Sequence, residues 1–261
     1  MTKPIRTTAD GPGDGCGLGA MPMFRALPEP VRGELSAMAQ TRRFARNETI
    51  FAAQEPQDHV GCVVSGVLRM QRVLADGQEQ IVGLLVASDM FGRMFDGPLA
   101  FAIEAATDAE VCLFRRGPFE ALLGRSPELE KLVILNILNE VDAALEWVGV
   151  LANRKVSARA ASFLLMLCRR WALQTGALSL EGGRISVSVP LSRHDLALFL
   201  GTRPETLSRA IHSLAEDGLI GIRSPHEFDI LDLDGLTRLS GQDYLSETDP
   251  LLRLTKTASN S

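Results

Sequence analysis

The chain has 261 residues, 46% of them hydrophobic and 23% charged, and its formal net charge is −5 at pH 7. This composition is typical of a soluble globular protein with one large or two modest domains. No apolar run approaches the length that spans a bilayer, and the first residues lack the apolar stretch of a secretory signal. We therefore expect a cytoplasmic protein with no membrane partner and with a flexible leader over residues 1–20.

The net charge is spread unevenly along the chain. Residues 153–223 hold ten Lys or Arg against five Asp or Glu, so this segment is net +5 and, given the total of −5, the remainder is net −10. A basic segment on an acidic chain is expected when one part of a protein binds phosphate.

Residues 42–119 are rich in short β-forming runs separated by turn residues, after one or two expected short helices over residues 21–40. Asp76-Gly77 predicts a two-residue hairpin turn of type I′, because glycine tolerates the positive φ that such a turn requires. Several short strands at this spacing predict a small antiparallel barrel or sandwich, which we assign to residues 21–125. The expected strand regions are TIFAAQ, VGCVVSG, LRMQRVL, QIVGLLV and AEVCLF.

A long helix is expected over residues 126–152. Ser126 suits an N-cap, Pro127 suits the first turn, and the acidic residues after it favour the positive end of the helix dipole. An apolar seam then recurs in steps of 3 or 4 residues, which is typical of a two-helix coiled coil, so we expect a homodimer interface. The flanking residues Leu132, Leu135 and Trp147 are apolar too, so a helix lying on its own barrel stays an alternative, and one face could touch the barrel while the other pairs with a second subunit. The predicted interface residues are Ile134, Leu138, Val141, Leu145 and Val148.

Residues 153–240 follow the order helix, strand, helix-turn-helix and β-hairpin, which describes a winged helix-turn-helix. An amphipathic helix comes first, and the strand RISVSVP follows it. A short helix, SRHDLALFL, leads through the turn GTR into a second helix that starts near Pro204, and a final hairpin turns near Ser224-Pro225. Residues 241–261 are assigned to a C-terminal tail.

The second helix of this motif carries Glu205, Ser208 and Arg209 at i, i+3 and i+4, on one face. Arg209 can donate to O6 and N7 of guanine, Glu205 can accept from cytosine N4, and Ser208 can contact a thymine methyl or a phosphate. The alternative is a solvated Glu205–Arg209 ion pair, which contributes only roughly 0.2 to 0.5 kcal/mol. The turn, the wing and the basic segment around this face favour base reading in double-stranded DNA.

Polar side chains at the ends of the two helices are expected to contact the DNA backbone, because phosphates would run along them. These residues are Ser192, Arg193, His194, Thr202, Arg203 and His212. Behind the polar face, the two helices need a common apolar core, with Gly201 in the turn between them. The residues expected to form that core are Leu196, Phe199, Leu200, Leu207, Ile211 and Leu214.

The four cysteines, Cys16, Cys62, Cys112 and Cys168, are widely spaced and form no C-x-x-C pair. Such spacing argues against a zinc site or a redox dithiol, and a cytoplasmic chain of this size does not need disulfides. We therefore expect buried free thiols. The four histidines show no metal-ligand spacing and no nucleophile stands beside a base in a catalytic motif, so we expect neither a metal site nor an enzyme.

Most of the chain resembles the Crp/Fnr family of bacterial transcription regulators. The resemblance rests on VVSGVLR and DMFGR in the β-rich region, on the long helix, and on the Glu-x-x-Ser-Arg pattern formed by Glu205, Ser208 and Arg209. It implies an α+β fold with an N-terminal cyclic-nucleotide-binding-like β-roll, a dimerisation helix and a C-terminal winged helix-turn-helix. It also implies that these three side chains carry base recognition.

The Glu-x-x-Ser-Arg pattern is similar to that of the Fnr branch, which recognises inverted repeats of TTGAT. The segments VGLLVASDMFGR and ALEWVGVLANRK look most like the Fnr-type regulators of α-proteobacteria, such as FixK and Dnr. The resemblance thus implies a homodimeric transcription regulator of oxygen-, nitrogen-oxide- or redox-linked metabolism that acts through RNA polymerase.

Two departures from the family limit the cofactors that the resemblance implies. The phosphate-holding Gly-Glu-Leu and Arg-Ser elements of the catabolite activator protein are replaced by FGRMF and PLAFAIEA, so we expect no cAMP binding. Fnr holds a [4Fe–4S] cluster with three N-terminal cysteines and one in the barrel, whereas only Cys16 and Cys112 match here, too few for a cubane's four ligands. Haem, with His59 or a methionine as ligand, stays open, although His59 beside Asp58 also fits a solvated turn.

The tip of the predicted hairpin is the surface that we expect to contact RNA polymerase, through Asp76, Gln78 and Glu79. The alternative function is a sensor gated by haem or another small molecule, in which a ligand in the β-roll changes the affinity for DNA. The two hypotheses differ in whether the purified protein binds a TTGAT-type site unaided.

Overall fold

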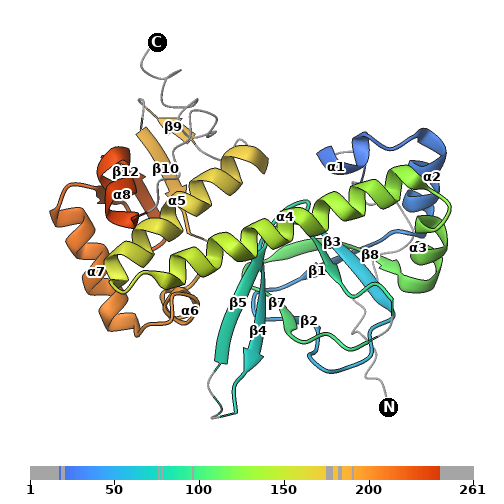
Figure 1. The fold of residues 1–261 in the computed structure, drawn as a ribbon, viewed down its shortest axis with the longest axis horizontal. Coiled ribbons are helices and arrows are strands. Elements are labelled where there is room, and N and C mark those ends of the chain that lie inside the picture. Colours follow the sequence, from blue (N-terminus) through green and yellow to red (C-terminus); the bar gives the residue numbers. More distant parts are fainter. Residues whose placement is uncertain are drawn as a thin grey trace. The chain divides into compact units, whose positions relative to one another are not determined.

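The computed structural model describes residue 18 and residues 21–75, 77, 79–95, 97–174, 179–181, 184–189 and 191–241, so nearly all of the expected leader and tail lies outside the described residues. The chain forms two compact units, Met1–Val141 and Asp142–Ser261, and the division falls within the long helix α4 (Pro127–Ala152) (Figure 1). Each unit combines helices with antiparallel strands. Among the described residues, no helix has both the length and the apolar character needed to cross a membrane.

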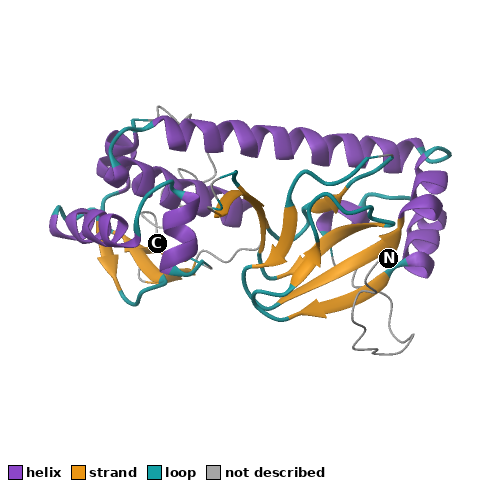
Figure 2. Ribbon diagram, turned by 90° about the horizontal axis from the view of Figure 1, so that it is seen from below, coloured by secondary structure: helices purple, strands orange, loops and turns teal. Residues whose placement is uncertain are grey.

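The first unit is built on two four-stranded antiparallel sheets, and strands are orange in Figure 2. The strands of one sheet, in spatial order, are β1 (Gln40–Phe44), β8 (Ala109–Arg115), β3 (His59–Ser65) and β6 (Met90–Gly92). Those of the other are β2 (Thr49–Phe51), β7 (Ala102–Ala105), β4 (Leu68–Val73) and β5 (Glu79–Leu85). This arrangement confirms the expected β-rich domain.

The sheet that contains β8 separates two hydrophobic cores. Along β8, Val111 and Leu113 enter the core shared with the other sheet, whereas Cys112 and Phe114 enter a second core. Successive side chains of a strand point to opposite faces, so a strand buried on both faces reads as a continuous apolar run. Four helices contribute to the second core: α1 (Pro22–Arg25), α2 (Glu29–Met38), α3 (Arg116–Leu123) and the first turns of α4.

The predicted hairpin joins β4 to β5, but its turn is not the two-residue type I′ turn. The last strand pair is Val73 with Glu79, so residues 74–78 form the connection. Gly77 does have a positive φ, of 81°. The Asp-Gly signal therefore located the turn correctly, but it did not define the length of the loop.

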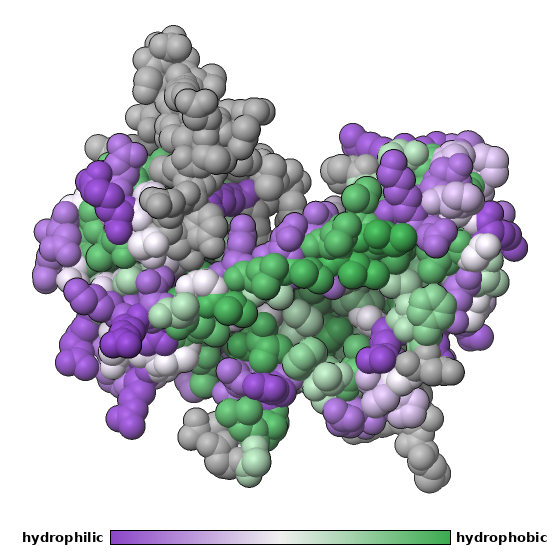
Figure 3. Space-filling model, viewed as in Figure 1, coloured by the Kyte–Doolittle hydropathy of each residue, from purple (hydrophilic) through white to green (hydrophobic). Residues whose placement is uncertain are grey.

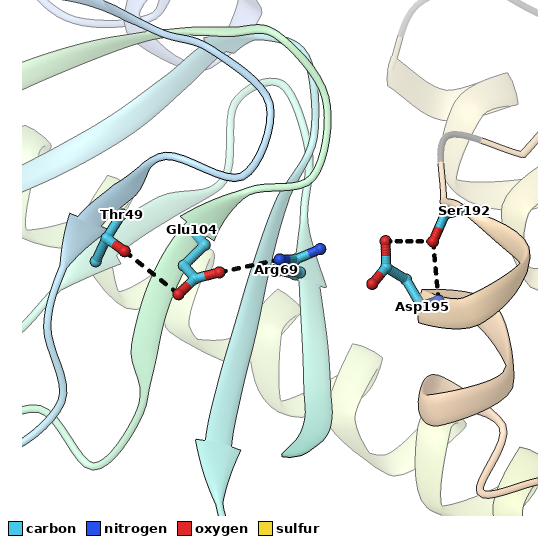
Figure 4. Close-up of polar contacts among 5 residues, drawn as sticks. All are labelled: Thr49, Arg69, Glu104, Ser192 and Asp195. Atoms are coloured by element: carbon cyan, nitrogen blue, oxygen red, sulfur yellow. Dashed lines mark hydrogen bonds and ion pairs between the residues drawn. The ribbon is translucent and has the colours of Figure 1, made fainter.

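Three short strands of the first unit, β1, β6 and β7, were not predicted, and neither was β9 of the second unit. β1 reads QTRRF, and only its last side chain is buried, so it carries no apolar pattern. β7 holds Glu104, whose carboxylate accepts hydrogen bonds from Thr49 Oγ1 at 3.3 Å and from Arg69 Nη2 at 3.0 Å (Figure 4). This polar row ties β2, β7 and β4 together across the sheet.

α4 begins where the sequence predicted. The Ser126 hydroxyl accepts a hydrogen bond from the Leu129 amide at 3.3 Å, as an N-cap does. Further along, the buried Asn136 side chain accepts from the Met90 amide and donates to the Ser88 carbonyl, both at 3.3 Å. These bonds fix this side of α4 to the loop before β6.

Of the three apolar residues expected to flank the seam, Leu132 packs against the core of the first unit, as the alternative predicts, whereas Leu135 and Trp147 do not. Leu135 is half exposed, because it lies about 100° around the helix from Asn136, which faces the β-roll. Trp147 is buried, but its ring stacks on Phe199 of the second unit, with ring centroids 3.5 Å apart and an interplanar angle of 16°.

The second unit contains the winged helix-turn-helix. Its helices are α5 (Val156–Gln174), α6 (Arg193–Phe199), α7 (Pro204–Glu216) and α8 (Leu233–Ser240). Its four-stranded sheet, in spatial order, is β11 (Ile220–Ile222), β12 (Glu227–Ile230), β10 (Arg184–Ser188) and β9 (Ser179–Glu181). β11 and β12 form the wing at the predicted place, whereas α8 was not predicted.

Candidate nucleic-acid interface

Local features define the start of α6, the turn after it and the start of α7. The Ser192 hydroxyl caps α6 by accepting from the Asp195 amide at 3.0 Å, and it donates to the Asp195 carboxylate at 2.7 Å (Figure 4). Gly201 has a φ of 60°, a conformation that glycine adopts without steric cost. Pro204 then occupies the first turn of α7, where its missing N–H is not needed.

Arg159 of α5 fixes the end of α6 from a distant part of the sequence. Its Nη1 donates to the Leu200 carbonyl at 2.7 Å and to the Gly201 carbonyl at 3.3 Å. A cation at a helix C-terminus also opposes the negative end of the helix dipole. This role of Arg159 was not predicted, because a contact between residues 41 positions apart leaves no local signal in the sequence.

An aromatic cluster supports the motif from behind. Phe199 at the end of α6 stacks on Trp147, and its ring meets that of Phe163 edge-on at 5.5 Å and 75°. All six residues predicted to form the core of the motif are buried: Leu196, Phe199, Leu200, Leu207, Ile211 and Leu214. The angle of α7 is therefore set by packing on both α6 and α5.

The opposite face of α7 presents the three predicted base-reading residues. Glu205 and Arg209 are exposed, and Ser208 is partly exposed. Within the described residues, neither Glu205 nor Arg209 takes part in an ion pair, so the alternative of an internal pair is not realised. The carboxylate and the guanidinium both remain available to a ligand.

The predicted phosphate-contacting residues fall into two groups. His194, Arg203 and His212 are exposed, and Thr202 is partly exposed. Ser192 is engaged in the cap of α6, and Arg193 turns toward the wing. Arg193 Nη2 donates to the Pro225 carbonyl at 3.3 Å, its guanidinium lies 5.8 Å from the centre of the Phe228 ring, and burial lowers its pKa. Ser192 and Arg193 thus hold the motif together.

The wing is braced by a polar network that the sequence did not predict. The buried Asp229 carboxylate of β12 accepts from Ser186 Oγ at 2.5 Å and from Arg223 Nε at 2.8 Å. In addition, His226 Nδ1 lies 3.1 Å from the Leu191 carbonyl, next to the start of α6. The wing is therefore tied to β10 through Asp229 and to the residue before the α6 cap through His226.

A stripe of exposed apolar side chains runs along α4, and it is green in Figure 3. All five predicted interface residues belong to it, and Leu145 and Val148 are each 63% exposed. Exposed rows of this kind mark a surface that another molecule covers. The stripe consists of Ile134, Leu135, Ile137, Leu138, Val141, Leu145, Val148 and Leu151.

A cavity of about 500 Å³ lies between the β-roll and α4 within the first unit. Its wall is mostly apolar and includes three phenylalanines and three methionines, Phe91, Phe95, Phe101, Met70, Met90 and Met94. Its polar lining residues are Arg93, Glu130, Asn136 and Glu140. Two carboxylates beside one arginine disfavour a phosphate. His59 is not among the lining residues, and its Nδ1 lies 2.6 Å from the Asp58 carboxylate.

Two of the four cysteines are buried free thiols, as predicted: Cys62 and Cys168. Burial raises the pKa of both thiols, that of Cys168 to about 12. Cys112 is disulfide-bonded, so the prediction of a free thiol there is wrong. Spacing along the chain could not reveal this, because a disulfide depends on which residues meet in the fold. Cys16 lies outside the described residues. In the described ranges, no three His, Cys, Asp or Glu side chains form a metal-binding group.

Comparison with known proteins agrees with this architecture. Residues 41–126 match the cyclic nucleotide-binding domain, and residues 158–239 match the Crp-like helix-turn-helix domain. The transcriptional activator protein FnrL of Cereibacter sphaeroides is 32% identical over 215 residues, which are 80% of this chain and 85% of FnrL. The nitrogen fixation regulation protein FixK of Bradyrhizobium diazoefficiens is 28% identical over 207 residues, 79% of this chain and 85% of FixK.

The crystal structure of FixK2 from Bradyrhizobium japonicum superposes with a TM-score of 0.67 at 28% identity, over 77% of this chain and 96% of FixK2. The relatives named here are regulators, and FnrL is a transcriptional activator. The two matched domains correspond to the β-roll and to the winged helix-turn-helix of this structure, in that order along the chain. The chain belongs to the Crp/Fnr family of transcription regulators, with a cyclic nucleotide-binding domain followed by a Crp-like helix-turn-helix.

Proposed function

We propose that this protein binds an inverted repeat of TTGAT-type half-sites as a homodimer, with one α7 helix in the major groove of each half-site. The observation that carries this proposal is the outward face of α7. Glu205 and Arg209 are exposed there, and no ion pair joins them among the described side chains. A carboxylate and a guanidinium one helical turn apart form a donor and acceptor pair that matches base edges.

The three base-reading side chains would divide the half-site between them. Arg209 is long enough to donate two hydrogen bonds to one guanine, which is the commonest specific contact in the major groove. Glu205 would accept from the amino group of a cytosine, and Ser208 would contact a thymine methyl or a phosphate. His194, Thr202, Arg203 and His212 would then hold the phosphates on either side, while Ser192 and Arg193 keep the start of α6 in place.

The stripe on α4 supports the homodimer. A helix that exposes eight apolar residues in water is stabilised when a second copy covers them, and two parallel copies would pair Ile134, Leu138, Val141, Leu145 and Val148. A two-fold dimer also explains an inverted repeat, because the symmetry of the protein is copied in the half-sites.

Regulation would proceed through contact with RNA polymerase at the β4–β5 hairpin. Asp76 and Gln78 lie outside the described residues, and Glu79 is exposed at the start of β5. We propose that this regulation belongs to oxygen-, nitrogen-oxide- or redox-linked metabolism; one relative is named a transcriptional activator and another a nitrogen fixation regulation protein. Replacing Asp76, Gln78 and Glu79 by alanine should leave DNA affinity unchanged and lower transcription in a reconstituted assay.

The binding mode is tested by fluorescence anisotropy with a duplex that carries two TTGAT half-sites. Arg209→Ala should weaken binding by about 1 to 3 kcal/mol per half-site and remove the preference for the guanine pair. Arg238→Ala, which removes an exposed arginine of α8, is the matched charge control and should have little effect. If Arg209→Ala keeps the wild-type preference for guanine over adenine at that position, Arg209 does not read the base.

The cavity between the β-roll and α4 favours a second function, a sensor in which a ligand there changes the affinity for DNA. A cavity of about 500 Å³ accommodates a small organic molecule, and its apolar wall suits a hydrophobic one. We propose that cAMP is not this ligand, because Glu130 and Glu140 would repel its phosphate. Haem is one such candidate, and a lining methionine such as Met70 would supply a thioether sulfur to hold it. A [4Fe–4S] cluster is not proposed.

The two functions are separated by the DNA affinity of the purified protein before and after addition of haem or cAMP. Tight binding to the TTGAT duplex without an addition, unchanged by either compound, supports the unaided regulator. Binding that appears only with haem supports the sensor. Micromolar affinity for cAMP in a calorimetric titration would contradict the reading of the cavity.

A further inference from the structure

Five sulfur-containing side chains gather in the second core of the β-roll. Cys62 of β3 is directly opposite Cys112 on β8 and directly opposite Met90 on β6. Opposing residues of neighbouring strands point to the same face, so these three side chains form a row across the sheet. Met21 and Met23 of the α1 region cover this row, and all five residues belong to or pack against one core cluster.

Within this group, the Cys62 thiol is in contact with two thioethers. Its Sγ lies 3.7 Å from Met21 Sδ and 3.9 Å from Met23 Sδ. A metal–thiolate bond of about 2.3 Å, as at zinc sites, places two sulfurs of one tetrahedral or trigonal shell about 3.8 to 4.0 Å apart. The Cys62 sulfur therefore already lies at a ligand-to-ligand distance from each of the two thioether sulfurs.

We propose that Cys62, Met21 and Met23 form a binding site for a soft monovalent metal ion, Cu(I) in the first place. Thiolate and thioether ligands select soft ions, and hard divalent ions prefer oxygen. On binding, the Cys62 S–H bond breaks, its proton goes to solvent, and the thiolate and two thioether sulfurs each donate an electron pair to the ion. No oxidant or reductant is needed.

The surroundings of the site favour a single positive charge. Cys62 is fully buried, Met21 is 5% exposed, and their neighbours in the cluster include Phe24 and Phe114. A Cu(I)–thiolate pair has no net charge, whereas a divalent ion with one thiolate would leave an unpaired charge in an apolar core. Met23 is only partly buried, so an ion would enter the site from the side of the Met23 side chain.

The site is distinct from the family's iron–sulfur arrangement and from the cavity. It uses the free thiol Cys62 and leaves the disulfide-bonded Cys112 outside the ligand set. Binding would fix α1 to β3 within the core that also holds Leu129 and Val133 of α4. The proposal does not depend on DNA binding, so its test can fail while the proposed function stands.

The test is an anaerobic titration of the full chain with Cu(I) buffered by bicinchoninate, with metal and protein quantified together. The wild type should take up one Cu(I) per chain, and Zn(II) should not replace it. Met21→Leu and Met23→Leu keep the side-chain volume and should each weaken Cu(I) binding at least about tenfold, the lower limit found even for outer-shell partners. Cys62→Ala should abolish it. Circular dichroism of each variant checks that it is folded.

Met38→Leu is the matched control, because Met38 packs against the same core cluster from α2, and it should bind like the wild type. The Cys16→Ser/Cys112→Ser double variant should also keep the site. The proposal is overturned if the wild type takes up no Cu(I), if folded Cys62→Ala still binds it, or if Met38→Leu loses as much affinity as Met21→Leu. Loss of binding in the double variant would place the ion on those two cysteines and would equally overturn it.

Discussion

Replacing Leu145 by glutamine should separate the proposed homodimer into monomers. Leu145 is 63% exposed in the single chain, and a partner helix would cover that fraction. Full burial of a leucine side chain contributes about 1.5 to 3 kcal/mol, so covering 63% of it contributes about 1 to 2 kcal/mol. A two-fold interface contains the residue twice, so the loss is about 2 to 4 kcal/mol per dimer, and the dimer Kd should rise about 30- to 700-fold.

The dissociation constant is measured by sedimentation equilibrium over a range of protein concentrations. Lys131→Gln, an exposed change on the same helix outside the stripe, is the control and should leave Kd within a factor of two or so, because surface substitutions usually cost under about 0.5 kcal/mol. The urea unfolding midpoint of the monomer should not fall, since Leu145 is already exposed there. A dimer Kd that is the same for both variants would refute the assignment of the stripe as the interface.

Four further substitutions test the internal architecture by urea unfolding. Gly201→Ala should lower the free energy of unfolding by about 1 kcal/mol, because φ is 60° although the new methyl lies 3.5 Å from its nearest neighbour. Gly66→Ala should lower it more, because its methyl would also clash with the Asp108 carbonyl. Equal losses for the two variants would contradict this prediction. Arg159→Met should lower the free energy of unfolding by about 1.5 to 3 kcal/mol, because it removes two charge-assisted hydrogen bonds to the end of α6. An unchanged urea midpoint would show that Arg159 does not stabilise the end of α6. The Cys168 pKa rises from 9.0 to about 12 on folding, so the stability that the buried thiol contributes is full below pH 9 and is lost as the pH rises toward 12. In Cys168→Ala the free energy of unfolding should therefore fall less between pH 9 and pH 12. The same fall in the wild type and the variant would contradict this prediction.

The elements that the sequence predicted well are those whose signals are local. The N-cap at Ser126, the glycine turn at Gly201 and the first-turn Pro204 each depend on one residue and its neighbours, and all three lie as predicted. The six core residues of the helix-turn-helix follow from helical spacing alone. The continuous apolar run along β8 predicted a strand, although the run could not show that the two faces of the strand enter different cores.

What the sequence could not predict depends on contacts between distant residues. Arg159 reaches the end of α6, and Asp229 collects Ser186 and Arg223 in the wing, but no spacing rule relates these positions. The disulfide-bonded state of Cys112 has the same origin. β1 was missed for another reason: its residues are polar, and a strand with one buried side chain has no apolar period to detect.

The candidate sensor cavity and the proposed dimer interface use the same side chains. Ile134 and Ile137 line the cavity, and they are also 49% and 46% exposed in the stripe of α4. A partner helix that covers the stripe would therefore change the wall of the cavity, and a ligand that moves these residues would change the interface. Because coupling between two binding equilibria is reciprocal, a ligand that lowers the dimer Kd by some factor must bind the dimer more tightly than two separate monomers by the same total free energy. Leu145 does not line the cavity. Its replacement should therefore weaken the dimer but leave the affinity of the monomer for that ligand unchanged.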